Sequence, residues 1–192
     1  MNINNNPTYS LTTLKYFRII SLVLHTLVFA AMCTFNFSTC YIYYQYWSLL
    51  ISWTSSALLI YPTFTKHRSK NINFGSYIFA CIRFLETAIS TQFVSVLLYW
   101  WVWGQNLSAS NLSYSDYAVI SANSLPLFLT SLEIVMDGII FDKKYYYYPM
   151  SLSIAFLITN VIYTFRTTNN YIYFWSWVNV SSYVYGGLFV AI

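Results

Sequence analysis

The sequence predicts an all-α fold, a polytopic membrane helical bundle of about six transmembrane helices with both termini on the cytoplasmic or matrix side. Only 7% of the 192 residues are charged, whereas roughly a quarter are charged in soluble domains. Apolar runs follow one another with short connections, and a run of ~20 residues crosses the hydrocarbon core as a helix. Lys and Arg gather at the ends of these runs, mostly on one side.

The chain divides into a short polar N-terminal segment, 1–16, and a single six-helix transmembrane domain, 17–192. No small-residue cleavage site follows the first apolar run, which indicates a retained span and not a signal peptide. Residues Phe74–Cys81 are expected to lie at the interface or to extend a tilted third helix. The six expected spans are Phe17–Phe37, Tyr46–Tyr61, Ile82–Trp103, Tyr117–Ile140, Tyr147–Phe165 and Tyr171–Ile192.

The distribution of Lys and Arg predicts the orientation of the bundle. Short loops rich in Lys and Arg stay on the cytoplasmic side of a membrane, or on the matrix side in mitochondria. With six spans, one side holds only Arg166, and Arg83 lies near the end of a span. Both termini and the even-numbered connections are therefore expected inside. The positive side carries Lys15, Arg18, Lys66, Arg68, Lys70, Lys143 and Lys144.

Composition also excludes several classes of function. The basic groups are short and lie at span ends, so the chain is not expected to bind nucleic acid. Cys33, Cys40 and Cys81 show no CxxC spacing, which argues against a zinc site or a disulfide framework. His25 and His67 are too few for a transmembrane haem or copper centre. We expect no metal and no cofactor, with bound phospholipid as the one accompanying molecule.

Strongly polar side chains inside spans are costly in lipid and mark candidate sites. The polar residues of the fourth span recur every three or four residues, so they lie on one face of its helix. The two charged residues of the third span, Arg83 and Glu86, are three residues apart and also share a face. We expect Arg83 to pair with Glu133 or Asp137. This group is either an ion pair that locks two helices or part of a proton or cation relay. The expected intramembrane polar cluster is Arg83, Glu86, Asn123, Glu133 and Asp137.

Several apolar and aromatic segments carry a family resemblance. They are Gln92–Trp100, Asn123–Pro126 through Leu132–Glu133, Tyr148–Pro149 leading to Val161–Tyr163, and Tyr171–Trp177. Together they resemble the rolling-stone and androgen-induced-protein family of six-span membrane proteins. The expected number of spans and the inside position of both termini agree with that family.

In the androgen-induced branch, the resemblance implies hydrolysis of lipid esters by a threonine nucleophile near the second span and a histidine in the fourth. The family's histidine aligns with Ile120, which cannot accept a proton. The second span offers Ser48 or Ser52 and no matching threonine. A rearranged hydrolase site would need His25 on the first helix to face one of these serines.

The preferred functional hypothesis is a non-catalytic accessory or scaffolding subunit of a larger membrane complex, with membrane lipids and other membrane-protein subunits as partners. A residue usage typical of AT-rich genomes favours the mitochondrial inner membrane, with a secretory-pathway membrane as the alternative. Glycosylation of the sequons at Asn36, Asn106, Asn111 and Asn179 would distinguish these two locations, because a mitochondrial protein leaves them unmodified. The competing hypotheses are a membrane-embedded lipid-ester hydrolase and a small transporter or proton-conducting protein.

Overall fold

A computed structural model describes residues 10–36, 43–65, 72–102, 113–139 and 143–167 of the chain. Within these ranges the protein is helical and contains no strand. The elements are α1 (Leu11–Asn36), α2 (Tyr44–Phe64), α3 (Ile72–Val102), α4 (Tyr114–Asp137), the 3₁₀ turn η3 (Lys143–Tyr145) and α5 (Tyr147–Thr167). The all-α prediction is confirmed for the described part of the chain.

Three of these helices are long and apolar enough to cross a membrane: the stretches Thr12–Thr34 of α1, Gly75–Trp100 of α3 and Asp116–Asp137 of α4. This finding agrees with a membrane protein. The second and fifth expected spans also fall on helices, α2 and α5, each 21 residues long. Their many Ser, Thr and Tyr side chains make them more polar than an ideal span. The sixth expected span, Tyr171–Ile192, lies outside the described residues.

Two helix starts differ from the sequence prediction by six residues or more. The first helix begins at Leu11 and not at Phe17, because the polar residues before Phe17 continue the same helix. The third begins at Ile72, so the segment Phe74–Cys81 is part of one continuous helix of 31 residues. Of the two alternatives considered for that segment, the structure shows the extended helix.

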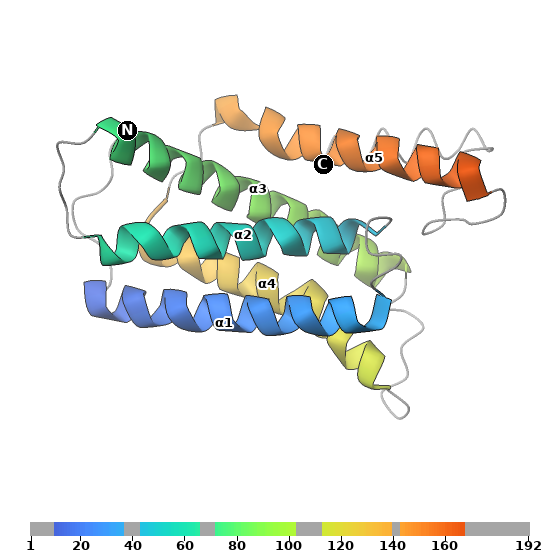
Figure 1. Cartoon of the computed structure of the whole chain (residues 1–192), viewed down its shortest axis with the longest axis horizontal. Helices are drawn as coiled ribbons and strands as arrows, with labels where there is room; N and C mark the ends of the chain where they lie inside the picture. Colours follow the sequence, from blue (N-terminus) through green and yellow to red (C-terminus); the bar gives the residue numbers. More distant parts are fainter. Residues whose placement is uncertain (1–9, 37–42, 66–71, 103–112, 140–142, 168–192) are drawn as a thin grey trace.

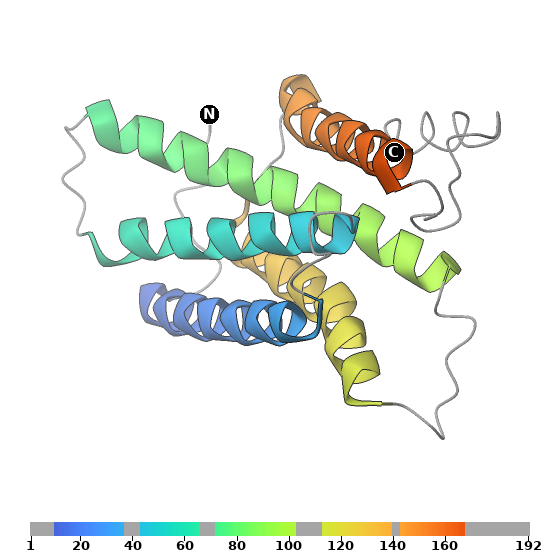
Figure 2. The ribbon, with the colours of Figure 1, turned by 45° about the vertical axis from the view of Figure 1, so that its right-hand side comes forward.

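Successive helices run in opposite directions (Figure 1). The beginnings of α1 and α3 therefore lie at the same end of the bundle as the ends of α2 and α4. The third helix is central, since it packs against α2, α4 and α5. The fifth helix lies on the far side of α2 and α3 from α1, as both ribbon views show (Figure 2).

The fourth helix has well-defined ends. At its start, Ser113 and Asp116 form a capping box, in which each side chain accepts a hydrogen bond from the other residue's backbone N–H. At its end, Gly138 adopts a left-handed conformation with φ 62°, which glycine permits without steric cost. These signals fix the length of α4 and thereby the position of the acidic residues in its last turn.

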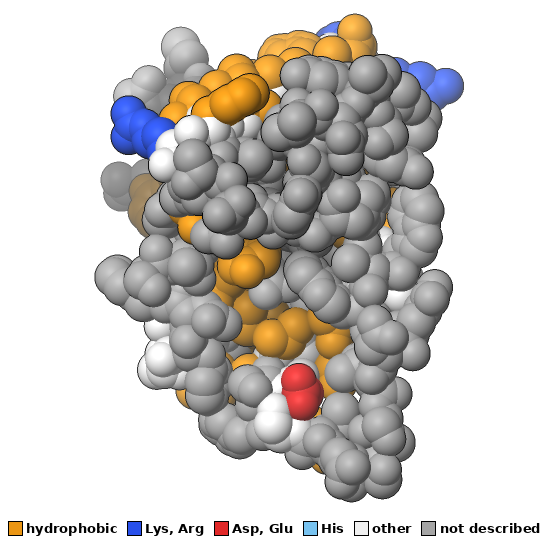
Figure 3. All heavy atoms as spheres, turned by 90° about the vertical axis from the view of Figure 1, so that its right-hand side faces the viewer, with side chains coloured by type: hydrophobic (Ala, Val, Ile, Leu, Met, Phe, Trp, Pro, Cys, Tyr) orange, Lys and Arg blue, Asp and Glu red, His pale blue; other side chains and the backbone are white. Residues whose placement is uncertain are grey.

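Large hydrophobic side chains cover the outward faces of the bundle. On α1 they include Ile20 and Leu27, which are 55% and 61% exposed, and on α5 they include Ile158 and Phe165, which are 55% and 65% exposed. The view onto the end of the bundle where α1 finishes shows hydrophobic side chains together with an acidic one low in the view and Lys or Arg at its upper margins (Figure 3). A hydrocarbon surrounding suits such faces better than water does.

Candidate functional site

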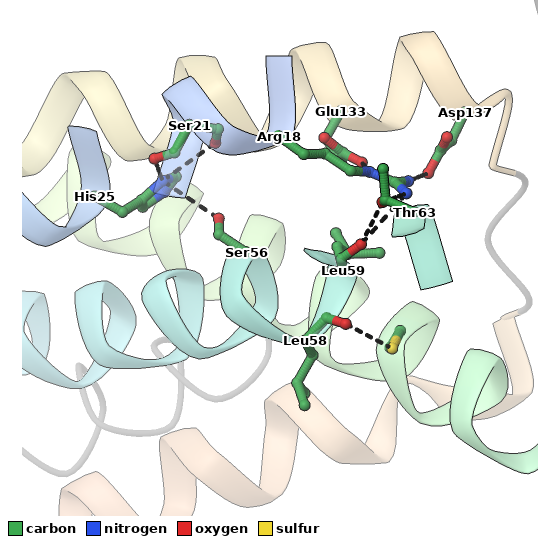
Figure 4. Close-up of polar contacts among 10 residues, drawn as sticks. Arg18, Ser21, His25, Ser56, Leu58, Leu59, Thr63, Glu133 and Asp137 are labelled. Carbon is green, nitrogen blue, oxygen red and sulfur yellow. Dashed lines mark hydrogen bonds and ion pairs between the residues drawn. The ribbon is translucent and has the colours of Figure 1, made fainter. Parts of the chain in front are cut away.

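Arg18 occupies the centre of a buried polar group near the positive end of the bundle. Its side chain comes from α1 and is 7% exposed. Its Nε atom lies 2.5 Å from Oε1 of Glu133, and its Nη2 atom is paired with Oδ2 of Asp137. Both carboxylates belong to the last turns of α4 (Figure 4). A single guanidinium thus holds two acidic side chains of another helix.

The second helix completes this group. Arg18 Nη1 donates to Thr63 Oγ1 at 2.5 Å and lies 3.4 Å from the carbonyl oxygen of Leu59. Thr63 donates in turn to the same Leu59 carbonyl at 2.6 Å. Every guanidinium nitrogen of Arg18 therefore faces an oxygen acceptor, and the side chain ties α1, α2 and α4 together (Figure 4).

The expected pairing of Arg83 with Glu133 or Asp137 is wrong, because Arg18 takes both carboxylates. Arg83 instead pairs with Glu86 three residues along α3. The cause is the face of α3 on which Arg83 lies. Cys81 and Leu85 pack towards Ile134 of α4, whereas the Arg83 guanidinium lies under the Tyr145 ring, before the start of α5.

Sequence reasoning missed Arg18 as a site residue because it was counted only as a charge at the membrane surface. A signal was nevertheless present. The buried positions of α1 recur at alternating spacings of four and three residues, which is the pattern of a helix face packed against other helices. They are Leu14, Arg18, Ser21, His25, Val28 and Met32.

Asn123 forms a separate polar group nearer the opposite end of α4. Its Nδ2 atom donates to Gln45 Oε1 at 3.1 Å and to the Val119 carbonyl at 2.8 Å. Its Oδ1 atom accepts from Ser95 Oγ at 3.1 Å. This fully buried amide links α2, α3 and α4. The expected five-residue polar cluster is therefore distributed over three places in the bundle.

His25 does not meet either predicted serine. The hydroxyl of Ser48 donates to the Gln45 carbonyl, and that of Ser52 donates to the Ser48 carbonyl, so both are bound to their own helix. The imidazole of His25 lies instead against Ser56, one turn beyond Ser52, with 3.3 Å between Nδ1 and Oγ (Figure 4).

The hydrogen bonds of His25 define what the ring can do. Its Nδ1 atom lies 2.8 Å from the carbonyl oxygen of Ser21. A carbonyl can only accept, so Nδ1 carries the proton in the neutral ring. The nitrogen that faces the Ser56 hydroxyl is then a donor and cannot take the hydroxyl's proton. This arrangement stabilises the packing of α1 on α2 and does not activate a nucleophile.

Within the described ranges, no group of three or more His, Cys, Asp or Glu residues is placed to hold a metal ion. No protein-family model matches the chain, and neither a curated protein nor a solved structure does. The resemblance to the rolling-stone and androgen-induced-protein family stays a prediction.

Proposed function

We propose that this chain is a non-catalytic, multi-pass membrane protein that serves as an accessory or scaffolding subunit of a larger membrane complex. The observation that supports it is the use of the buried Arg18. All of its nitrogens contact groups on neighbouring helices, so its charge is used to hold α1, α2 and α4 together. A buried ion group of this kind fixes how helices assemble.

In this proposal the chain crosses the membrane six times, with both termini and the basic residues Lys15, Lys143 and Lys144 on the inner side. The membrane is the mitochondrial inner membrane. The exposed hydrophobic faces of α1 and α5 contact lipid and neighbouring subunits, since apolar helix surfaces pack equally well against either.

The two competing functions have weaker support. A hydrolase needs a base that accepts the proton of a hydroxyl, and His25 presents its N–H to Ser56. A proton or cation relay needs a connected polar path. Among the described residues, no hydrogen bond joins the Arg18 group to the Asn123 group.

The first test is recovery of the tagged full chain from its native membranes in a mild detergent, with quantitative mass spectrometry of what accompanies it. We expect fixed stoichiometry with the same membrane subunits in repeated preparations. We also expect those subunits to lose their assembly when the chain is depleted and to regain it when the wild-type chain is restored. A solitary chain that turns over a lipid ester would refute the proposal.

The membrane and the topology are tested on the same sample. Asn106 and Asn111 precede α4 on the proposed outer side, so glycans on them would place the chain in the secretory pathway and remove the mitochondrial assignment. Single cysteines introduced near Lys143 should be labelled by a membrane-impermeant maleimide only after the inner side is opened.

A further inference from the structure

A cavity bounded by α2, α3 and α5 combines hydrocarbon walls with a buried cation. Its volume is about 490 Å³, within the roughly 300–1,000 Å³ typical of small-molecule sites. The apolar walls come from Ile51 of α2, Phe79 and Phe84 of α3, and Leu152 and Ala155 of α5. Such walls suit an acyl chain.

Arg83 supplies the charge in this wall. Its side chain is 4% exposed, and its Nη1 atom is paired with Glu86. Its Nε and Nη2 atoms are also buried, and neither has a hydrogen-bond partner among the described residues. Buried guanidinium N–H groups without acceptors are costly, and Arg18 in the same bundle has acceptors for all of its nitrogens. Arg83 therefore has two strong donors left over for an acceptor that enters the cavity.

Aromatic rings and a second basic side chain lie next to Arg83. The Tyr145 ring covers its guanidinium, with 3.8 Å between Cζ and the ring centroid. The Nζ atom of Lys144 lies 4.8 Å from the centroid of the same ring, and Lys143 precedes it in η3. Among the described residues, Glu86 is the carboxylate that pairs with Arg83. An anionic group is attracted to the Nε and Nη2 donors of Arg83, which have no acceptor among these residues, while a second cation is repelled.

We propose that the cavity binds an anionic amphiphile with one acyl chain between α3 and α5. Its carboxylate or phosphate head accepts hydrogen bonds from Nε and Nη2 of Arg83, in the fork geometry that guanidinium offers to such anions. The half-buried Tyr145 ring turns aside to admit the head. The acyl chain extends from Phe79 towards Ala155 along the two parallel helices.

The test uses the full chain in phosphatidylcholine nanodiscs and an oleate analogue that carries a photoreactive diazirine. We expect saturable labelling of peptides from α3 and α5. Unlabelled oleate, dioleoyl phosphatidate and the uncharged methyl oleate then compete for the site. Competition by oleate alone identifies a carboxylate head, competition by phosphatidate alone identifies a phosphate head, and competition by both shows that the site takes either. Equal competition by the uncharged methyl oleate would overturn the proposal.

Two pairs of variants test separately the charge of Arg83 and the open volume of the cavity. Arg83→Gln should weaken labelling at least tenfold, whereas Arg166→Gln removes the same charge from the exposed end of α5 and should leave it unchanged. Ala155→Trp fills the cavity with Arg83 intact and should abolish labelling. Ile154→Trp adds the same ring to the neighbouring exposed position outside the cavity and should not. If Arg83→Gln fails to fold, the tryptophan pair decides, and undiminished labelling of Ala155→Trp would refute the site.

Discussion

Arg18 Nε lies 2.5 Å from Glu133 Oε1, so a buried ion pair joins two helices whose residues are 115 positions apart in the chain. Asp137 and Thr63 contact the same guanidinium. One side chain of α1 thus contacts both α2 and α4. Removal of the cation alone should cost more stability than removal of the whole ion group, because it would leave two carboxylates buried without a counter-charge.

Replacement of Arg18 by Gln should therefore destabilise the protein by about 3–5 kcal/mol, the usual cost of breaking a buried ion pair from one side. The free energy of unfolding, measured by SDS titration of the detergent-solubilised chain, reports the loss. Arg166→Gln, an exposed position in the last turn of α5, is the control and should change stability by less than about 0.5 kcal/mol.

A variant in which all three charged residues of this group are replaced by neutral ones tests the same explanation. Arg18→Met combined with Glu133→Gln and Asp137→Asn removes the unpaired charges along with the ion pair, so it should recover a large part of the stability lost in Arg18→Gln. If the triple variant were less stable than the single one, the attribution of the loss to uncompensated charge would be wrong.

Asn123 is the second polar residue that joins three helices. Its replacement by Ala leaves Ser95 Oγ and Gln45 Oε1 without their partner in the helix interface. We expect a loss of about 1–3 kcal/mol, the cost of leaving buried polar groups unsatisfied. Ser124→Ala on the exposed side of the same helix is the matched control. Equal unfolding free energies for the two variants would show that the Asn123 hydrogen bonds contribute nothing to stability.

The sequence was sufficient to predict the five described α-helices, because long apolar runs with few charges favour helices almost irrespective of which partners they pack against. It was insufficient for the helix starts. Thr12 and Thr13 before the first run, and Asn73 before the third, are polar enough to lower hydropathy, yet they continue the helices. A hydropathy profile reports the part of a helix that lies in hydrocarbon and not the whole helix.

The sequence alone could not show which arginine pairs with Glu133. Arg18 and Arg83 both lie towards the same end of the bundle, and the choice between them depends on which neighbouring element each side chain faces. Arg18 lies on the face of α1 that packs on α2 and α4. On α3 it is Cys81 and Leu85 that face α4, while Arg83 lies under the Tyr145 ring. His25 illustrates a second limit, because the sequence does not show how far two packed helices are displaced along their axes. A shift of one turn along α2 replaces Ser52 by Ser56 as the neighbour of His25.

Two glycine-to-alanine substitutions should change the free energy of unfolding in opposite directions. Gly138 ends α4 with φ 62°, and a Cβ atom there would meet nothing within 4 Å, so the cost of Gly138→Ala is conformational and should be about 1–2 kcal/mol. Gly75 lies within α3, and a Cβ there also meets nothing within 4 Å. Because alanine is the better helix former, Gly75→Ala should stabilise the protein by about 0.5–1 kcal/mol.

The measurement is again the unfolding free energy in detergent, with both variants beside the wild type. Shifts in opposite directions support the left-handed end of α4. A stabilising effect of Gly138→Ala would mean that residue 138 has a negative φ, and that α4 does not end there.

The last prediction concerns the contact of His25 with Ser56, which lies 3.3 Å from the imidazole. Such a distance by itself invites a catalytic interpretation. The Ser21 carbonyl, however, fixes the proton on the nitrogen that faces the serine, so the hydroxyl has no base and stays a weak nucleophile. We expect a fluorophosphonate probe to leave Ser56 unmodified in the purified chain, as judged by mass spectrometry of α2 peptides, while a serine hydrolase added to the same sample is labelled fully. Labelling of the wild type that disappears in both Ser56→Ala and His25→Ala would contradict this, because it requires the opposite tautomer, and it would restore the hydrolase hypothesis with Ser56 as the nucleophile.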